Sequence, residues 1–496
     1  MKKYFSFILI LGTLFGCDSI LSPDPQGLIT VDKLFSTESG IVTAVNGAYE
    51  PLQGIYKGEL LRITELGSDD GWIWRKEVEP DIFIIDQTYG GIQGIWADHY
   101  TGITRTNTIL NRIEKFEDFT SETLKKSLTG QARFLRAFYY FNLVRLFGGV
   151  PLIMDEVVSR QDAEKPRASI QQVYDQIMVD LNEAIQLLPN DNTTKNGNQA
   201  GMANAKSAQA LLVLVNLELE KWDKVISGSS ELIKSGALQS NYAGNFNGSQ
   251  ENGNHTFFEV QYGGVAGATT SGISNTYSPP DYGGLAAILP TDDDLQGKGG
   301  SLSSGNGFMQ LFEAGDRRKT VLVQNYGLTN FIDPTKPKGS LYFVNKYYNT
   351  VDPRGLSTWN YPLIRFSEIL LARAEALNEA GYVADGEAFE LLNRIRMNAG
   401  LPRLTAGELP NQAKLREAIR KERRIELAFE AKRYFDLNRW GLLEASVQKQ
   451  MDFLNLTFPK SKIIVHPITK KSYYLNPIPS IEFTNNAKLG VQNPGY

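Results

Sequence analysis

The chain has 496 residues, of which 42% are hydrophobic and 21% charged, and this is the composition of a globular protein and not of a disordered one. Its 51 basic and 55 acidic side chains give a formal net charge of −4, so it lacks the basic excess on which a general nucleic-acid binder depends. A single cysteine excludes a disulfide framework and a cysteine-based zinc site.

The first residues have the pattern of a secretory signal. Two lysines precede an apolar run over residues 4–15, which is shorter than the about 20 residues that span a membrane as a helix. Cys17, the only cysteine, follows directly and stands where a bacterial lipobox has its acylated cysteine. We therefore expect a signal peptide over residues 1–16, a lipid anchor on Cys17, and a proline-containing tether over residues 17–26. The alternative is an ordinary signal peptide with an incidental cysteine.

Helical periodicity dominates residues 27–240. Apolar side chains recur every three or four positions in four stretches, residues 124–147, 170–188, 205–219 and 222–233. Ser169 and Gln172 have the spacing of a capping box, and Gly236 is expected to close the last of these helices as a C′ residue. Short paired helices with alanines at contact positions predict tetratricopeptide-like hairpins.

The composition changes in residues 241–360. Residues 241–310 alone hold 14 of the 45 glycines, and Lys298 is their only lysine or arginine, so this stretch is not expected to sustain helices. Its best strand candidate is residues 257–262. Long irregular segments inside a compact chain are usually functional, so we expect residues 241–360 to be a loop-rich region that faces a ligand.

A second set of helices is expected in the C-terminal part, residues 361–496. Within residues 365–443, the first helix ends at Gly381, the second ends at Gly400, and the third begins near Gln412. The predicted fold is therefore mainly α, with two sets of tetratricopeptide-like helix hairpins and a large irregular insertion between them.

The sequence offers no local motif for catalysis, a metal or a cofactor, and we expect none of the three. No histidine lies in an HExxH or HxxxH pattern, and the GxSxG motif of a nucleophilic serine is missing. Residues 297–300 lack the register of a phosphate-binding loop, and residues 292–303 lack the glutamate of a calcium loop. Glu422 and Glu426 lie among arginines, which favours a structural lattice of ion pairs over the two carboxylates of a glycosidase.

Aromatic residues in the expected loops are the candidates for ligand contact. Flat rings suit the apolar faces of pyranose sugars, while neighbouring Asp, Asn and Arg side chains bond hydroxyl groups. On this reasoning we predict that a ligand contacts six residues, Trp72, Trp74, Tyr89, Tyr277, Tyr282 and Trp359. The alternative for each is that it covers the core beneath a loop. Trp96, Trp222 and Trp440 lie in helical patterns and are assigned to packing.

Several motifs strongly resemble those of the SusD/RagB family. The run over residues 361–376, YPLIRFSEILLARAEA, is similar to the central signature of that family, and residues 422–430 (ERRIELAFE) are similar to a second one. Further matches follow the family's order along the chain, at residues 131–137, 146–151, 316–318, 433–437, 439–441 and 492–496. The resemblance covers nearly all of the chain after Cys17.

The resemblance implies a surface lipoprotein of the outer membrane of Bacteroidota that is not an enzyme. Such proteins have a helical, tetratricopeptide-type core, and each caps a SusC-like TonB-dependent transporter to which it hands oligosaccharides or, in some members, peptides. The family motifs are scaffold, so the six aromatic residues rest on our own inference. Two further alternatives stay open at this point, a surface glycoside hydrolase and a purely structural scaffold of a membrane complex.

Overall fold

The structure is a computed structural model that describes residues 30–71, 80, 83–190, 200–263, 270, 271, 273, 277, 288, 289, 308–325, 342–347, 357–454 and 463–496. The predicted signal peptide, Cys17 and the tether lie outside these residues. Within the described residues, every helix is too short or too polar to cross a membrane.

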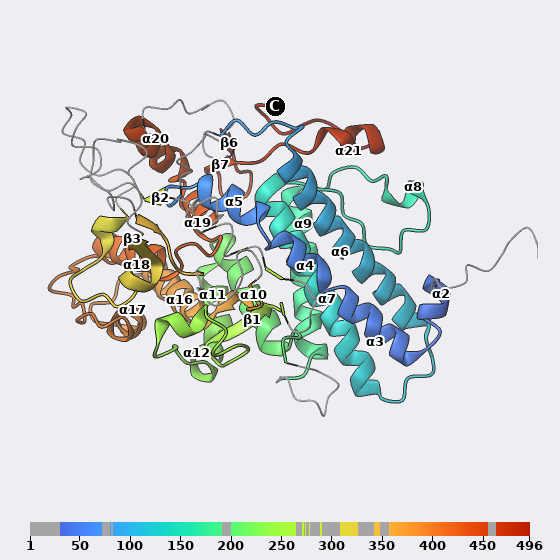
Figure 1. Ribbon diagram of the computed structural model, residues 1–496, viewed down its shortest axis with the longest axis horizontal. Coiled ribbons are helices and arrows are strands. Elements are labelled where there is room, and N and C mark those ends of the chain that lie inside the picture. The colour runs from blue at the N-terminus through green and yellow to red at the C-terminus, as the bar shows by residue number, and fades with distance from the viewer. Residues whose placement is uncertain are drawn as a thin grey trace, which may run out of the picture.

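Helices form most of the described fold, as the sequence predicted (Figure 1). The first part of the chain contains α2 (Val31–Leu34), α3 (Glu38–Gly47), α4 (Glu50–Ile55), α5 (Glu59–Leu66), α6 (Gly90–Lys115), α7 (Glu122–Phe147), α8 (Arg160–Ala163) and α9 (Ile170–Leu187). Next come α10 (Ala205–Glu218), α11 (Trp222–Ser229), α12 (Leu232–Ser235) and the 3₁₀ helix η3 (Tyr242–Asn245). The side chains of Ser121, Ser169 and Asn204 cap α7, α9 and α10, and the capping box expected at Ser169 is confirmed.

The C-terminal part repeats the helical pattern. It contains α16 (Phe366–Ala380), α17 (Glu387–Asn398), α18 (Gln412–Glu426), α19 (Arg433–Trp440), α20 (Leu443–Leu454) and α21 (Ser480–Asn485). Consecutive helices pack in order, with α7 between α6 and α9, α10 against α9 and α11, and α16 against α11, α17 and α18. This continuous series of antiparallel neighbours is the tetratricopeptide-like arrangement that the sequence predicted.

The described strands form three small antiparallel sheets. The strands are β1 (Thr256–Val260), β2 (Ile288–Leu289), β3 (Val323–Asn325), β4 (Tyr342–Val344), β5 (Tyr361–Arg365), β6 (Ile463–Val465) and β7 (Ser472–Tyr474), and η6 (Met309–Leu311) and α15 (Lys319–Leu322) precede β3. The pairs are β1–β5 and β6–β7, and β4 lies between β2 and β3. Strand β5 is buried along its whole length and runs directly into α16, so β1 and β5 join the first helical set to the second.

A buried lattice of ion pairs holds β5 to the end of α18 and the loop that follows it. Arg365 donates two hydrogen bonds to the carboxylate of Glu430 at 2.8 and 2.7 Å and one to that of Glu426 at 2.8 Å. Arg318 pairs with Glu426 and with Glu422, at 3.2 and 2.6 Å. The structural role expected of the two glutamates is therefore confirmed. We call this group the Arg365 lattice; it comprises Arg318, Lys346, Arg365, Glu422, Glu426 and Glu430.

The structure confirms that Gly236 ends a helix but corrects the reason for the glycine. The glycine does end a helix, but its φ of −106° is not left-handed. A Cβ atom at Gly236 would lie 2.2 Å from the ring of Phe366, so close packing against α16 and not a positive φ explains the glycine. The helix that the sequence predicted as continuous from Trp222 is also divided, into α11 and α12.

Gly102 sets the contact between α6 and α7, and its replacement by alanine tests that packing. The new Cβ would lie 2.3 Å from the ring of Tyr139, which is fully buried and whose hydroxyl donates to the Ala48 carbonyl at 2.6 Å. Overpacking costs about 1–3 kcal/mol, which exceeds the gain in helix propensity of up to about 1 kcal/mol. We expect G102A to unfold at lower denaturant concentration than the wild type.

The matched control for this substitution is Gly94 in the same helix. Gly94 is exposed, and a Cβ there would have no neighbour within 4 Å. G94A should therefore be as stable as the wild type or more stable. Equal destabilisation by both substitutions would contradict the packing explanation.

Candidate ligand-binding site

Three aromatic rings from separate parts of the loop-rich region pack on Phe429, in the loop after α18. The ring centroids of Tyr277 and Phe308 lie 6.2 and 5.3 Å from that of Phe429, and the hydroxyl of Tyr347 donates to the Phe429 carbonyl at 2.9 Å. Tyr277 and Tyr347 stack on each other at 5.3 Å. We call these four residues the Phe429 hub. The hub brings three separate parts of the loop-rich region together at one place on the helical scaffold.

The residues just before Trp72 are fastened to the same part of the scaffold. Arg424 donates to the carboxylate of Asp70 at 2.7 Å, and Arg433 donates to both carboxylate oxygens of Asp69 at 2.7 and 2.9 Å. The guanidinium of Arg424 also lies 5.7 Å from the ring centroid of Phe308. Bidentate arginine–carboxylate pairs have a fixed geometry, so the point at which the chain enters the Trp72 segment is firmly set.

The arginine charges keep Asp69 ionised although its side chain is buried. Burial alone would raise the pKa of Asp69, but the neighbouring Arg424 and Arg433 outweigh it and hold that pKa at about 2. Asp69 is therefore ionised at neutral pH and stays paired. Gly71 adds a last tie, because its carbonyl accepts a hydrogen bond from Gln450 of α20 at 2.9 Å.

Tyr277 lies inside the hub and not on its surface. Its side chain is only 3% exposed, and its hydroxyl donates to the Phe429 carbonyl at 3.3 Å. This burial favours the packing role that the sequence left open for Tyr277. The ligand contact predicted for this residue has no support from its geometry.

Tyr89 is half-buried at the start of α6. Its hydroxyl donates to the carboxylate of Glu59, the first residue of α5, at 3.1 Å. Burial and the neighbouring Glu59 raise the pKa of Tyr89 to about 12, so the phenol is neutral at physiological pH. In the chain, α5 and Gly71 precede the Trp72 segment, and Tyr89 follows it directly before α6.

Trp359 is half-buried on the β1 side of the molecule. Its indole covers Gly248, where a Cβ atom would lie 2.4 Å from the ring. The next residue, Asn360, donates to the side chains of Glu259 at 3.1 Å and Gln261 at 2.9 Å. A ring beside fixed amide groups is a suitable surface for a sugar. The described residues show no contact among Tyr89, Tyr277 and Trp359.

The other three predicted residues, Trp72, Trp74 and Tyr282, lie outside the described residues. Ligand contact by all six aromatics stays a prediction. No local pattern indicates the Phe429 hub, because Phe429 lies in a charged motif and its partners are distant in the chain. A usable local signal is the frequency of asparagine and glycine in residues 241–254, which include the Gly248 that the Trp359 ring covers.

The described residues do not assemble an obvious catalytic or metal centre. They contain no group of three or more His, Cys, Asp or Glu side chains placed to hold a metal ion. Burial lowers the pKa of all three histidines to about 4, so each is neutral at pH 7. Asp69 and Asp70, before the Trp72 segment, are paired with arginines.

Comparison with known proteins accounts for this scaffold. Residues 297–496 match the model of the SusD family, and residues 41–214 match a family model described as starch-binding associating with outer membrane. SusD-like protein P2 of Formosa agariphila is 28% identical over an alignment that covers 100% of both chains. The chain belongs to the SusD/RagB family.

Solved structures of SusD-like proteins share the fold. A laminarin-binding SusD-like protein superposes with a TM-score of 0.71 at 24% identity, covering 93% of this chain and 100% of that one. Surface glycan-binding protein A from Bacteroides fluxus gives a TM-score of 0.72 at 21% identity, with coverage of 93% and 100%.

Membership in the SusD/RagB family confirms two expectations. The family motif over residues 361–376 forms β5 and α16, and the motif over residues 422–430 supplies the Arg365 lattice, so both are scaffold. The protein is, like its SusD-like relatives, not an enzyme. Association with the outer membrane is a property of the family by its description.

Proposed function

We propose that this SusD/RagB protein is a cell-surface lipoprotein that captures oligosaccharides and delivers them to a SusC-like TonB-dependent transporter in the outer membrane. The observation that carries the proposal is that three residues of the loop-rich region and the chain just before Trp72 meet on one part of the scaffold, around Phe429 and the end of α18. The names of the relatives, which include a laminarin-binding and a glycan-binding protein, support a glycan as the ligand.

The proposed mechanism is capture without chemistry. Trp72, Trp74 and Tyr282 offer their rings to the apolar faces of sugar residues, and neighbouring polar groups bond the hydroxyls. The lattice and the hub keep the loop ends in place, which reduces the entropy lost when an oligosaccharide binds. Cys17 carries the lipid anchor, and residues 17–26 tether the folded part to the membrane beside its transporter.

Calorimetry with truncated aromatics tests the proposal. The soluble form that starts at residue 18 is titrated with a panel of plant, host and microbial glycans. We expect saturable heat with one of them, and we expect W72A or W74A to weaken that binding by about 1–3 kcal/mol, or roughly 5- to 150-fold, as truncation of an aromatic anchor does.

The control is W222A, because Trp222 begins α11 and packs against the core of the helical scaffold. A folded W222A variant should bind like the wild type. Silence across the glycan panel would contradict the glycan proposal and favour a peptide ligand. Heat that continues steadily after each injection, with new reducing ends, would instead indicate hydrolysis.

A further inference from the structure

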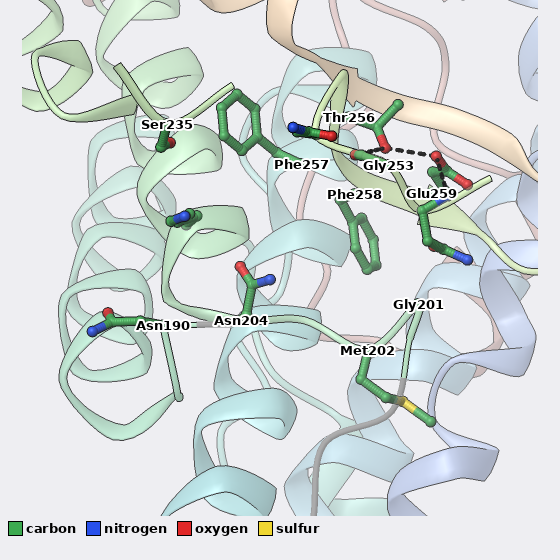
Figure 2. Close-up of a pocket in the computed structure, with 13 residues that line it drawn as sticks. Asn190, Gly201, Met202, Asn204, Ser235, Gly253, Thr256, Phe257, Phe258 and Glu259 are labelled. Carbon is green, nitrogen blue, oxygen red and sulfur yellow. Dashed lines mark hydrogen bonds between the residues drawn. The ribbon is translucent and has the colours of Figure 1, made fainter. Parts of the chain in front are cut away.

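A pocket lies where the end of α9, the start of α10 and β1 meet, and none of the four hub residues lines it (Figure 2). It has a volume of about 260 Å³. Its lining is rich in side-chain amides and hydroxyls, with two phenylalanine rings among them. We call it the amide pocket, defined by Asn190, Asn204, Ser235, Asn254, Phe257 and Glu259.

Three polar groups at this pocket are available to a ligand. The side-chain amides of Asn190 and Asn254 make no hydrogen bond with any described residue, and the ammonium group of Lys206 makes no ion pair with one. All three side chains are exposed. Each primary amide can donate and accept at the same time, which is the pattern that a pair of neighbouring hydroxyl groups requires.

The β1 wall of the pocket is rigid. The buried carboxylate of Glu259 accepts from the backbone of Asn252 at 3.0 Å, from the hydroxyl of Thr256 at 2.6 Å and from the amide of Asn360 at 3.1 Å. Figure 2 shows the first two of these bonds beside Gly253. Pairing of β1 with β5 fixes the strand itself. A site of this kind loses little freedom when it binds.

The pocket also has an apolar surface. Phe257 is half-buried, and its ring packs against that of Phe366 with 6.3 Å between the ring centroids. Polar groups around an aromatic ring suit the alternation of C–H faces and hydroxyl edges on a pyranose. The volume is just below the lower end of the range for drug-sized ligands, about 300–1,000 Å³, and so fits one or two sugar rings.

Other ligand classes fit less well. The side chain of Asn204 already accepts from the backbone N–H of Ser207, so the N-terminus of α10 is occupied by its own cap and is not an anion site. The surplus of amides at the rim disfavours an apolar ligand, because it would leave those groups without partners.

We propose that the amide pocket binds an uncharged saccharide of one or two rings, independently of the loop aromatics. Asn190 and Asn254 bond its hydroxyls, Phe257 lies against an apolar face of the sugar, and Lys206 bonds a hydroxyl at the rim. Because Asn360, the residue after Trp359, donates to the Glu259 carboxylate, the pocket lies at one end of a polar surface that continues along β1.

Saturation-transfer NMR tests this site with defined probes. The soluble form that starts at residue 18 is mixed with millimolar methyl glycosides of glucose, galactose, mannose and xylose. We expect transfer to at least one glycoside, and an apparent affinity at least about fivefold weaker in the N190A/N254A variant, from the loss of two hydrogen-bonding amides. Because both side chains are exposed and make no hydrogen bond with a described residue, the variant should fold, which circular dichroism checks.

The matched control is N46A. Asn46 is an exposed asparagine near the end of α3 whose side chain has no partner among the described residues. It should bind like the wild type. Equal transfer in N190A/N254A and in the wild type would overturn the proposal, and so would absence of transfer to every glycoside in the wild type.

The W72A/W74A variant separates this proposal from the proposed function. We expect it to keep the glycoside signal while it loses heat with the polymer. If the glycoside signal instead disappears in W72A/W74A and persists in N190A/N254A, the amide pocket is overturned and the loop site stands. If no polymer gives heat but the glycosides still report on Asn190 and Asn254, the pocket stands and the loop site fails.

Discussion

Replacement of Arg365 by methionine is expected to destabilise the protein by about 3–5 kcal/mol, which is the cost of removing one partner from a buried ion pair. Arg365 is 3% exposed and is bonded to the carboxylates of Glu426 and Glu430 and to the Glu426 carbonyl. Burial alone would raise the pKa of Glu430, but Arg365 and Lys346 together hold it below its ordinary value. Without Arg365, Lys346 alone would face that carboxylate.

Chemical denaturation measures this effect, and two further variants make it specific. R365K keeps the charge but loses the bidentate geometry, so its stability should lie between those of R365M and the wild type. R403M removes an exposed arginine that pairs with Glu390 on the surface, and it should change stability by at most about 1 kcal/mol. A loss of less than about 1 kcal/mol in R365M would contradict a structural role for the lattice.

The contrast between Arg365 and Arg403 shows what could be read from the sequence. The charged run at residues 420–430 predicted a lattice, because carboxylates four positions apart on a helix lie on one face among arginines. The run could not name Arg365 or Arg318 as partners, since each lies about 60 to 110 positions away along the chain. Their pairing depends on the antiparallel register of β1 and β5 and on the packing of α16, which are tertiary facts.

Helices were the most predictable elements. The stretch expected over residues 205–219 is α10 (Ala205–Glu218), because its cap and its apolar spacing are local features of the sequence. The position of Gly236 at a helix end was predicted correctly, but the reason for the glycine was not. The ring that requires it belongs to Phe366, which is far along the chain. Local patterns predict where a helix ends, but they do not identify the distant side chain that packs against that end.

The candidate site was less predictable than the fold. A loop aromatic in a sequence can serve as a binding platform or as cover for the core, and composition does not distinguish these roles. Tyr277 packs in the hub, whereas Trp359 lies half-buried beside bonded amides. The amide pocket is assembled from side chains more than 60 positions apart, such as Asn190 and Asn254. Exposed asparagine side chains indicate a binding site only when the fold brings them to one pocket.

The second large effect is a pH dependence that arises from Glu65 of α5. Its side chain is buried beside the hub, where one carboxylate oxygen accepts from the Ala431 backbone at 2.6 Å and the other has no hydrogen-bond partner among the described residues. Burial, with a further contribution from Asp70, raises the pKa of Glu65 to about 8. The folded protein therefore keeps a proton on this group at pH values at which the unfolded chain has released it.

The sign of the effect follows from this difference in proton binding. Unfolding releases a proton between pH 4.5 and 8, so a rise in pH across that window favours the unfolded state by about 1.4 kcal/mol for each unit. Glutamine has the shape of the protonated acid and does not titrate. We expect E65Q to gain stability relative to the wild type as pH rises from 5 to 8, by up to about 4 kcal/mol.

Denaturant unfolding of both proteins at pH 5, 6.5 and 8 measures this difference. E417Q is the control, because Glu417 is exposed on α18 and pairs only with Lys414 on the surface; its difference from the wild type should stay the same at all three pH values. A difference between E65Q and the wild type that is independent of pH would show that Glu65 is already ionised in the folded state. The buried carboxylate would then need a cation beside it, and among the described residues Lys346 lowers the pKa of Glu65 through its charge.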